Sequence, residues 1–173
     1  MLSLSLKKLC KMIYLRPFEL LEVNRLISWV NSPELLVQFS GPGFNFPLTK
    51  VAWDKHLSDT SIHPYFVVDL NTDETIGYSE IVKVDENEVK LCRLLIGDPD
   101  LRGLGLGKLL VRELIYESLA IASPKRILLN VYSHNTAAIK CYQSEGFVIN
   151  ESVSKTSLVD GMEWKSFQMD LML

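Results

Sequence analysis

The sequence predicts a single α/β domain around a mostly antiparallel sheet of about six to seven strands, flanked by helices. Short runs rich in β-branched and aromatic residues alternate with polar turns along most of the chain. Two amphipathic helical patterns, over residues 104–122 and 135–146, lie among the later runs. No internal repeat, low-complexity tract or change of composition marks a linker, so residues 1–173 are expected to form one domain.

The first elements follow from proline positions and apolar spacing. Residues 12–17 predict a short strand that ends at Pro17, because proline cannot donate to a strand ladder. Apolar side chains then recur at helical spacing over residues 18–39, and the break at Asn31-Ser32-Pro33 divides them into a helix, a turn and a second helix. The glycines and prolines of residues 40–47 predict an ordered loop or part of a site.

The remaining elements alternate strands with turns. Residues 104–122 carry one apolar face, and Ser123-Pro124 ends that helix. The shorter helix begins at Asn135 and stops at Gly146, where a left-handed cap costs little. The strands expected after the first are residues 63–70, 75–84, 89–96, 126–131, 147–153 and 163–172.

Composition excludes several classes of protein. The 173 residues are 47% hydrophobic and carry a formal charge of −3, which fits a soluble domain without broad attraction for nucleic acid or anionic lipid. No run reaches the roughly 18–20 apolar residues of a membrane-spanning helix. The scattered cysteines Cys10, Cys92 and Cys141 form no metal or redox pair, and they favour a reduced, cytoplasmic setting. Residues 1–11, with lysines after their apolar stretch and no cleavage pattern, are interpreted as a leader.

The glycine-rich segment at residues 95–108 indicates an anion site. It reads as a strand, a proline-bounded turn and three alternate glycines that open a helix. Unpaired amides at a helix N-terminus attract anions, and glycines let a phosphate approach the backbone. Arg102 and Lys108 add positive charge at the two ends of this loop.

Two common phosphate motifs are excluded there. A Walker A loop fails because Arg102 occupies its first glycine position and Leu109 follows Lys108. A dinucleotide fingerprint fails because Lys108 or Leu110 falls at its third glycine position. The pattern R-x-x-G-x-G, from Arg102 to Gly107, remains, and its alternative is a helix start that only makes a tight turn.

A second constellation follows the strand at residues 126–131. Asn135 and Tyr142 are seven residues apart, so they lie nearly in line on one helix face, with Ala138 between them. This arrangement fixes a tyrosine hydroxyl relative to the helix start. The alternative is an N-cap asparagine and a tyrosine that serves only packing.

Together the two segments resemble the GNAT superfamily of acyl-CoA-dependent N-acyltransferases. R-x-x-G-x-G lies on the strand-to-helix turn, and N-x-x-A-I-x-x-Y-x-x-x-G-F follows about thirty residues later. The opening Leu15-Arg16-Pro17 is also similar to the branch that contains ribosomal-protein N-terminal and polyamine acetyltransferases. The resemblance implies central strands that splay apart to form a cofactor cleft.

The resemblance also implies how acetyl-CoA would be held. Backbone amides of Gly103 to Lys108 would bind the pyrophosphate, with Arg102 at the start of the loop. The strand ending at residues 95–97 would pair with the pantetheine arm, and Asn135 would contact that arm. The full set of implied cofactor-binding residues is Leu95, Ile96, Gly97, Arg102, Gly103, Leu104, Gly105, Leu106, Gly107, Lys108, Asn135, Ala138 and Tyr142.

The implied activity is direct transfer of an acetyl group to a primary amine of a small molecule or a peptide N-terminus. Tyr142 would protonate the departing thiolate. Many relatives place a glutamate on the strand before the glycine loop, but residues 89–94 hold none, so Glu80 on the preceding strand is the substitute base. The alternative for Glu80 is an ordinary solvent-facing carboxylate.

Other features leave alternatives open. The aromatic residues of the first helical region and its loops could line an acceptor site, but a role in covering the core is favoured. These residues are Trp29, Phe39, Phe44, Phe46 and Trp53. The three histidines lack metal-ligand spacing, so no metal is expected. A catalytically silent acyl-CoA sensor of the same fold is the alternative function, and an edge strand or helix could support a homodimer.

Overall fold

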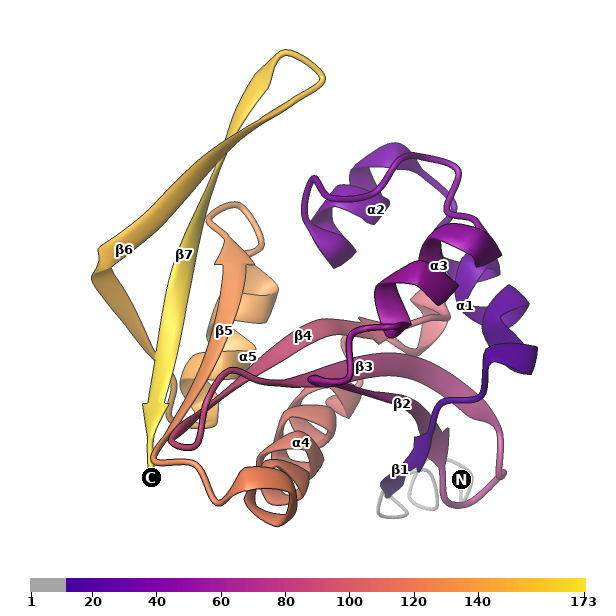
Figure 1. Cartoon of the computed structure of the whole chain (residues 1–173), viewed down its shortest axis with the longest axis horizontal. Coiled ribbons are helices and arrows are strands. Elements are labelled where there is room, and N and C mark those ends of the chain that lie inside the picture. The colour runs from indigo at the N-terminus through magenta and orange to yellow at the C-terminus, as the bar shows by residue number, and fades with distance from the viewer. Residues whose placement is uncertain (1–11) are drawn as a thin grey trace, which may run out of the picture.

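The structure, a computed structural model, describes residues 12–173 and is built on one seven-stranded sheet (Figure 1). The strand order is β1-β2-β3-β4-β5-β7-β6, and every neighbouring pair is antiparallel except β4–β5. The strands are β1 (Ile13–Pro17), β2 (Ile62–Asp69), β3 (Thr75–Lys83), β4 (Glu88–Ile96), β5 (Arg126–Tyr132), β6 (Val148–Val159) and β7 (Met162–Met172).

Five α-helices and two short 3-10 turns flank the sheet. Side chains cap the starts of three of the α-helices: Ser32 accepts from the Leu35 amide at α2, Thr49 caps α3, and Asn135 caps α5. The helices are α1 (Val23–Trp29), α2 (Pro33–Ser40), α3 (Lys50–Leu57), α4 (Leu106–Ala122) and α5 (Thr136–Ser144), and the 3-10 turns are η2 (Leu20–Glu22) and η3 (Pro99–Leu101).

Two hydrophobic clusters pack on opposite faces of β2–β4. The cluster on one face joins the sheet to α4, with Leu110, Val111 and Leu114 buried against Val89 and Leu91. The other joins the sheet to α1, α2 and α3 around the fully buried Trp53, Phe66 and Tyr78. Figure 1 shows α4 and the α1–α3 group on these opposite sides.

The two central strands part after a short stretch of pairing. β4 and β5 are parallel neighbours only from Glu88 to Leu91 on β4 and from Arg126 to Leu129 on β5. β4 then continues to Ile96 and β5 to Tyr132 without pairing each other, and Figure 1 shows the strands diverging. This opening lies in the middle of the sheet.

A β-bulge in β4 accompanies the divergence. The register with β3 runs from Tyr78 opposite Leu95 to Glu80 opposite Cys92, so β4 has one extra residue there. Arg93 has a positive φ of 56°, as bulged residues can. Before the bulge Val89 and Leu91 face the α4 cluster, whereas after it Leu95 faces the α1–α3 cluster. The bulge therefore shifts the alternation of β4 by one residue: odd-numbered residues face α4 before it, and even-numbered residues do so after it.

The structure confirms the predicted fold class, including the splayed central strands. It differs in two places. α3 was not predicted, because Lys50–Leu57 buries only Trp53 and has a weak apolar face. β6 extends to Val159 rather than to residue 153, because the polar residues added at its end pair with β7 instead of forming a turn.

Other sequence predictions concern the chain ends and membranes. The leader predicted over residues 1–11 lies outside the described residues. Within residues 12–173, every helix is too short or too polar to cross a bilayer.

Gly97, just after β4, is a position where any side chain is expected to destabilise the fold. A Cβ at Gly97 would overlap the indole ring of Trp29, while Gly97 N–H donates to the Ile76 carbonyl. We expect Gly97→Ala to lower the free energy of unfolding by about 1–3 kcal/mol in urea titrations, because the half-buried indole must move. Gly43→Ala is the control, because nothing lies within 4 Å of its added Cβ. Equal stability of the two variants would contradict this account.

Candidate active site

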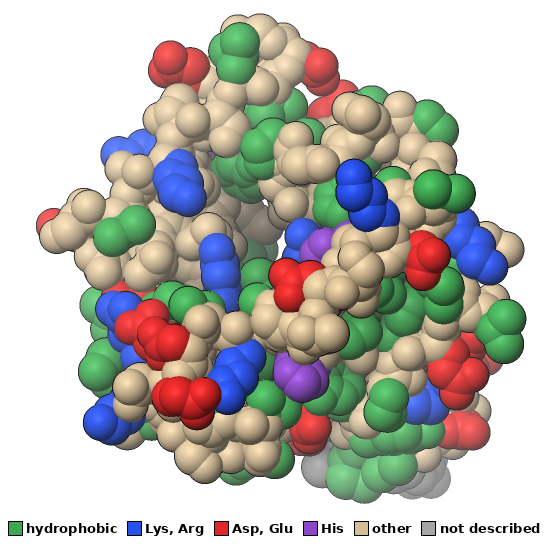
Figure 2. Space-filling view, in the orientation of Figure 1, with side chains coloured by type: hydrophobic (Ala, Val, Ile, Leu, Met, Phe, Trp, Pro, Cys, Tyr) green, Lys and Arg blue, Asp and Glu red, His purple; other side chains and the backbone are tan. Residues whose placement is uncertain are grey.

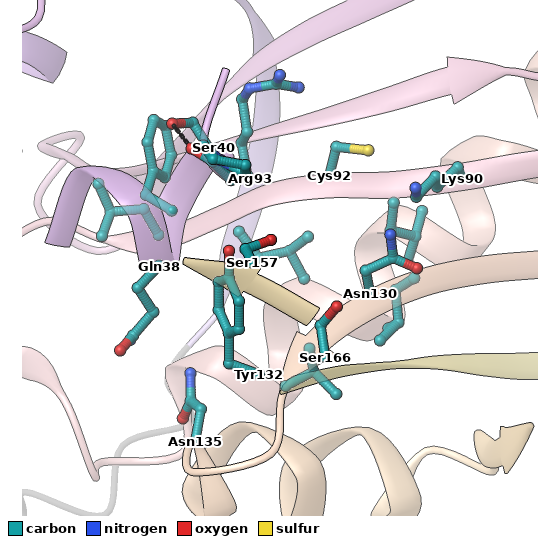
Figure 3. A pocket seen from close by; sticks show the side chains of 18 of the residues that line it. Gln38, Ser40, Lys90, Cys92, Arg93, Asn130, Tyr132, Asn135, Ser157 and Ser166 are labelled. Carbon is teal, nitrogen blue, oxygen red and sulfur yellow. Dashed lines mark hydrogen bonds between the residues drawn. The ribbon is translucent and has the colours of Figure 1, made fainter. Parts of the chain in front are cut away.

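A cavity of about 430 Å³ occupies the opening between β4 and β5. It is closed on one side by the end of α2 and the following loop, and on the other by β6 and β7. Figure 2 shows a hollow in this face, between the helical part and the β6–β7 part of the molecule. Figure 3 shows Lys90, Cys92 and Arg93 along β4 on one wall, and Gln38, Tyr132 and Asn135 elsewhere around the space.

Tyr142 of α5 lines this cavity. Burial, with a smaller contribution from Cys141, raises the pKa of its hydroxyl well above the ordinary value, so the phenol keeps its proton at neutral pH. The hydroxyl makes no side-chain hydrogen bond within residues 12–173, whereas the ring packs near Phe147. Tyr142 thus adds a protonated phenol to the residues that line the cavity.

Asn135 positions the same helix and also lines the cavity. Its side-chain oxygen accepts from the Ala138 amide at 3.2 Å, which is the N-cap contact of α5. The N-cap interpretation is therefore correct, and it is compatible with a second role for the amide nitrogen. Ala138 itself lies against the α4 cluster.

The glycine-rich loop forms a row of unpaired amides at the start of α4. Gly103 and Gly105 have φ values of 72° and 87°, and open space surrounds the position of each missing Cβ. In the described part of the chain, the backbone N–H groups from Gly103 to Gly107 donate to no backbone carbonyl, and α4 has no side-chain cap. Such a row of donors beside a helix N-terminus suits an anion.

The two basic side chains of this loop are engaged with the protein. Arg102 donates from Nε to the Ile96 carbonyl at 3.0 Å and from Nη2 to the Gly97 carbonyl at 3.2 Å. Lys108 Nζ lies 3.1 Å from Glu145, which also accepts from Arg112 at 2.7 Å. Arg102 therefore braces the loop against the end of β4, and Lys108 ties α4 to α5.

Glu80 is fully buried behind the cavity wall, and the solvent-facing alternative is wrong. Its carboxylate accepts from Tyr78 Oη at 2.8 Å and from Arg93 Nη1 at 2.6 Å. His56 Nε2 lies 3.0 Å from the same carboxylate. Glu80 does not line the cavity, and of its three partners only Arg93 does.

Aromatic rings enclose this buried network. The guanidinium of Arg93 lies 5.7 Å from the Phe44 ring centroid and 5.8 Å from that of Trp53. His56 packs beside both rings. Trp53 is fully buried and Phe39 nearly so, and Trp29 and Phe44 pack against the same cluster, which agrees with the predicted role of these four aromatics in the core. The core role is wrong for Phe46, which is 44% exposed and belongs to neither cluster. Phe39 also lines the cavity.

The structure brings together part of the predicted site. Leu95, Asn135 and Tyr142 line one cavity, although they come from different elements. The rest of the predicted cofactor set lies at the end of β4, in the glycine loop and on α5, outside the cavity lining.

Sequence reasoning missed several cavity-lining residues. Lys90 and Cys92 could have been found by alternation along their strand, but no sequence signal identifies residues on α2 or β6. The missed polar residues are Gln38, Lys90, Cys92, Arg93, Asn130, Tyr132, Lys155, Ser157 and Ser166. In the described chain, no group of three or more His, Cys, Asp or Glu side chains could hold a metal ion.

Comparisons with known proteins agree with this architecture. The model of the acetyltransferase (GNAT) family matches residues 31–147. The chain belongs to this family.

Among solved structures, the fold is similar to that of spermidine N-acetyltransferase from Vibrio cholerae in complex with CoA and spermine, with a TM-score of 0.77 and 20% identity over 93% of this chain and 95% of that chain. A dodecameric structure of the Vibrio cholerae enzyme in an intermediate state gives a TM-score of 0.71 and 19% identity, over 93% and 94% of the two chains. At these identities the likeness shows the fold alone.

The network around Glu80 is expected to contribute strongly to stability. Glu80→Gln removes the charge that balances Arg93 in a buried setting, where side-chain exposure is 0% for Glu80 and 15% for Arg93. We expect this variant to lower the free energy of unfolding by about 3–5 kcal/mol in denaturant titrations. Glu86→Gln, whose ion pair with Lys83 involves an 85% exposed carboxylate, should change it by less than about 1 kcal/mol. Similar losses in both variants would show that the buried network is not stabilising.

Proposed function

We propose that this protein is an N-acetyltransferase that transfers the acetyl group of acetyl-CoA to a primary amine. The observation that carries the proposal is the combination of the unpaired amide loop at α4 with Tyr142 in the cavity between β4 and β5. Membership in the acetyltransferase (GNAT) family and the CoA bound to the Vibrio cholerae relative support it.

The glycine loop fits the pyrophosphate of CoA. Amides from Gly103 to Gly107 face no protein acceptor in the described chain, and the absence of side chains at Gly103 and Gly105 leaves space for close approach. We assign the anion to these amides rather than to Arg102, because that guanidinium already donates to two carbonyls. The pantetheine arm would then pass along Leu95–Gly97 toward Asn135.

Tyr142 is proposed as the proton donor to the leaving sulfur. CoA supplies an activated acetyl thioester, whose carbonyl carbon forms a bond to the amine nitrogen as its bond to sulfur breaks. The sulfur takes a proton from Tyr142, and the amine gives one up to a base. The raised pKa keeps Tyr142 protonated before transfer, which disfavours a role as base. It also makes the phenol a weaker acid, so the proposed donor role rests on the position of Tyr142 in the cavity lining rather than on its pKa.

The assignment of the base follows from the position of Glu80. Both of its oxygens are engaged, and Arg93 stands between it and the cavity. We therefore propose that the main role of Glu80 is to position the side chains of Arg93 and His56. Its predicted action as a base requires a relay through His56 or water to the acceptor amine.

Tyr142→Phe is the direct test of the mechanism. We expect it to reduce kcat for thiol release from acetyl-CoA by about 10²–10⁴-fold, the range for general acid catalysis, while CoA binding by calorimetry stays within a few fold. The matched control is Tyr116→Phe on α4, where the tyrosine is 68% exposed and removed from the cavity lining; its kcat should be unchanged.

The same experiment separates the alternatives. CoA binding without thiol release in the wild-type protein, across amino acids, polyamines, aminoglycosides and short peptides, would favour the sensor function. Thiol release that is equal in wild type and Tyr142→Phe would keep the enzyme but remove the role of Tyr142. Failure to bind CoA would overturn the proposed function.

A further inference from the structure

The cavity has a one-sided charge. Lys90, Arg93 and Lys155 line it, and no aspartate or glutamate is among the described residues that do. This contrasts with the whole chain, in which acidic residues outnumber basic ones, 21 to 18. The local excess of positive charge is therefore a property of the site and not of the composition.

Two of these cations have no counter-charge among the described residues. Lys90 and Lys155 form no ion pair within residues 12–173, whereas Lys83 and Lys108 do. Lys90 comes from β4 and Lys155 from β6, on walls contributed by distant parts of the chain. An anion between these walls would meet positive charge from both.

Arg93 is partly balanced by Glu80 but keeps free donor capacity. Only its Nη1 reaches Glu80, and its Nε is buried with no hydrogen-bond partner in the described structure. Nε has almost no accessible surface, so a ligand cannot reach it. Nη2 forms no hydrogen bond within residues 12–173 and belongs to a side chain that is 15% exposed, so the guanidinium can still donate to an acceptor oxygen of a ligand. The bulge, Glu80 and the rings of Phe44 and Trp53 hold the guanidinium in place.

A polycationic acceptor is poorly matched to this surface. Every ammonium group beyond the reacting one would approach lysine or arginine, and like charges at close range repel. An amine that also carries a carboxylate would instead have a charge partner. The same cations favour the neutral form of the reacting amine, because nearby positive charge lowers the pKa of an ammonium group.

We propose that the acyl acceptor is a small amine that also bears a carboxylate, and that Lys90, Arg93 and Lys155 select it. This inference rests on the proposed function and specifies its acceptor. The carboxylate binds among the cations, and the amine is left to attack the acetyl carbon near Tyr142. The acceptor therefore differs in charge class from the spermidine named for the Vibrio cholerae relatives.

The test compares amines of similar length and different charge. γ-Aminobutyrate, γ-aminobutyramide and putrescine present a carboxylate, a neutral amide and a second ammonium at the far end, and β-alanine and longer ω-amino acids vary the length. We expect kcat/KM to be at least about tenfold higher for the best carboxylate amine than for its amide or diamine counterpart. Thiol release from acetyl-CoA is the readout.

Charge reversal supplies the matched variants. Lys155→Glu should lower kcat/KM for the carboxylate amine by about tenfold and raise it for the diamine, which inverts or abolishes the preference. Lys165→Glu makes the same charge change on β7, beside Ser166, whose side chain lines the cavity. Because neighbouring side chains on a strand point to opposite faces, Lys165→Glu should leave the preference unchanged.

The outcomes separate the acceptor class from the activity. Faster turnover of putrescine than of every carboxylate amine, or equal preference in wild type and Lys155→Glu, overturns the inference and leaves the acetyltransferase intact. If no amine releases thiol, the proposed function fails, and calorimetry on the CoA-saturated protein decides the inference. Carboxylate amines that bind more tightly than diamines support it, and no carboxylate binding overturns it.

Discussion

The parting of β4 from β5 after Leu91 is the constraint on which the site depends. Beyond this point the two strands no longer form hydrogen bonds with each other, and the space between them is a cavity rather than packed side chains. The bulge at Arg93 reverses, at the same point, the face of the sheet to which alternate side chains of β4 point. Arg93 therefore becomes part of the cavity wall, and Leu95 joins the α1–α3 cluster. Glu80 then balances a guanidinium that the backbone would otherwise bury without a partner.

Features encoded by local sequence were accessible to prediction. Strand and helix boundaries followed proline, glycine and apolar spacing, and the glycine loop could be recognised because its geometry depends on residues that adjoin in the chain. Asn135 and Tyr142 were predictable as a pair for the same reason, since one helix fixes their relative position. The predicted anion site depends on backbone amides, which glycines leave uncovered, so it could also be predicted from local sequence.

Features that depend on long-range pairing were not accessible. Lys155 reaches the cavity only because β6 bends between Asn150 and Ser154 and resumes pairing with β7. Arg93 is an ordinary strand residue in the sequence, and only its positive φ shows that it is the bulge. Glu80 offered two interpretations of equal weight, a base and a solvent-facing carboxylate. Its burial, which excludes the second, depends on long-range packing that brings His56 of α3 to its carboxylate. The short, weakly amphipathic α3 escaped prediction because its packing is concentrated in one tryptophan.

The ion pairs of Glu145 fix the distance between the two parts of the candidate site, the amide loop and Tyr142. Lys108 and Arg112 on α4 form ion pairs with this residue at the end of α5. Because the amide loop begins α4 and Tyr142 lies on α5, these ion pairs keep the loop and Tyr142 at a set span. Under the proposed function, an acyl donor would have to match that span, with its phosphates at the amide loop and its reactive carbonyl near Tyr142. A shorter acyl carrier, such as an acyl phosphate, would not reach both ends at once. The proposed site would therefore discriminate among acyl donors by their length before any contact with the acyl group.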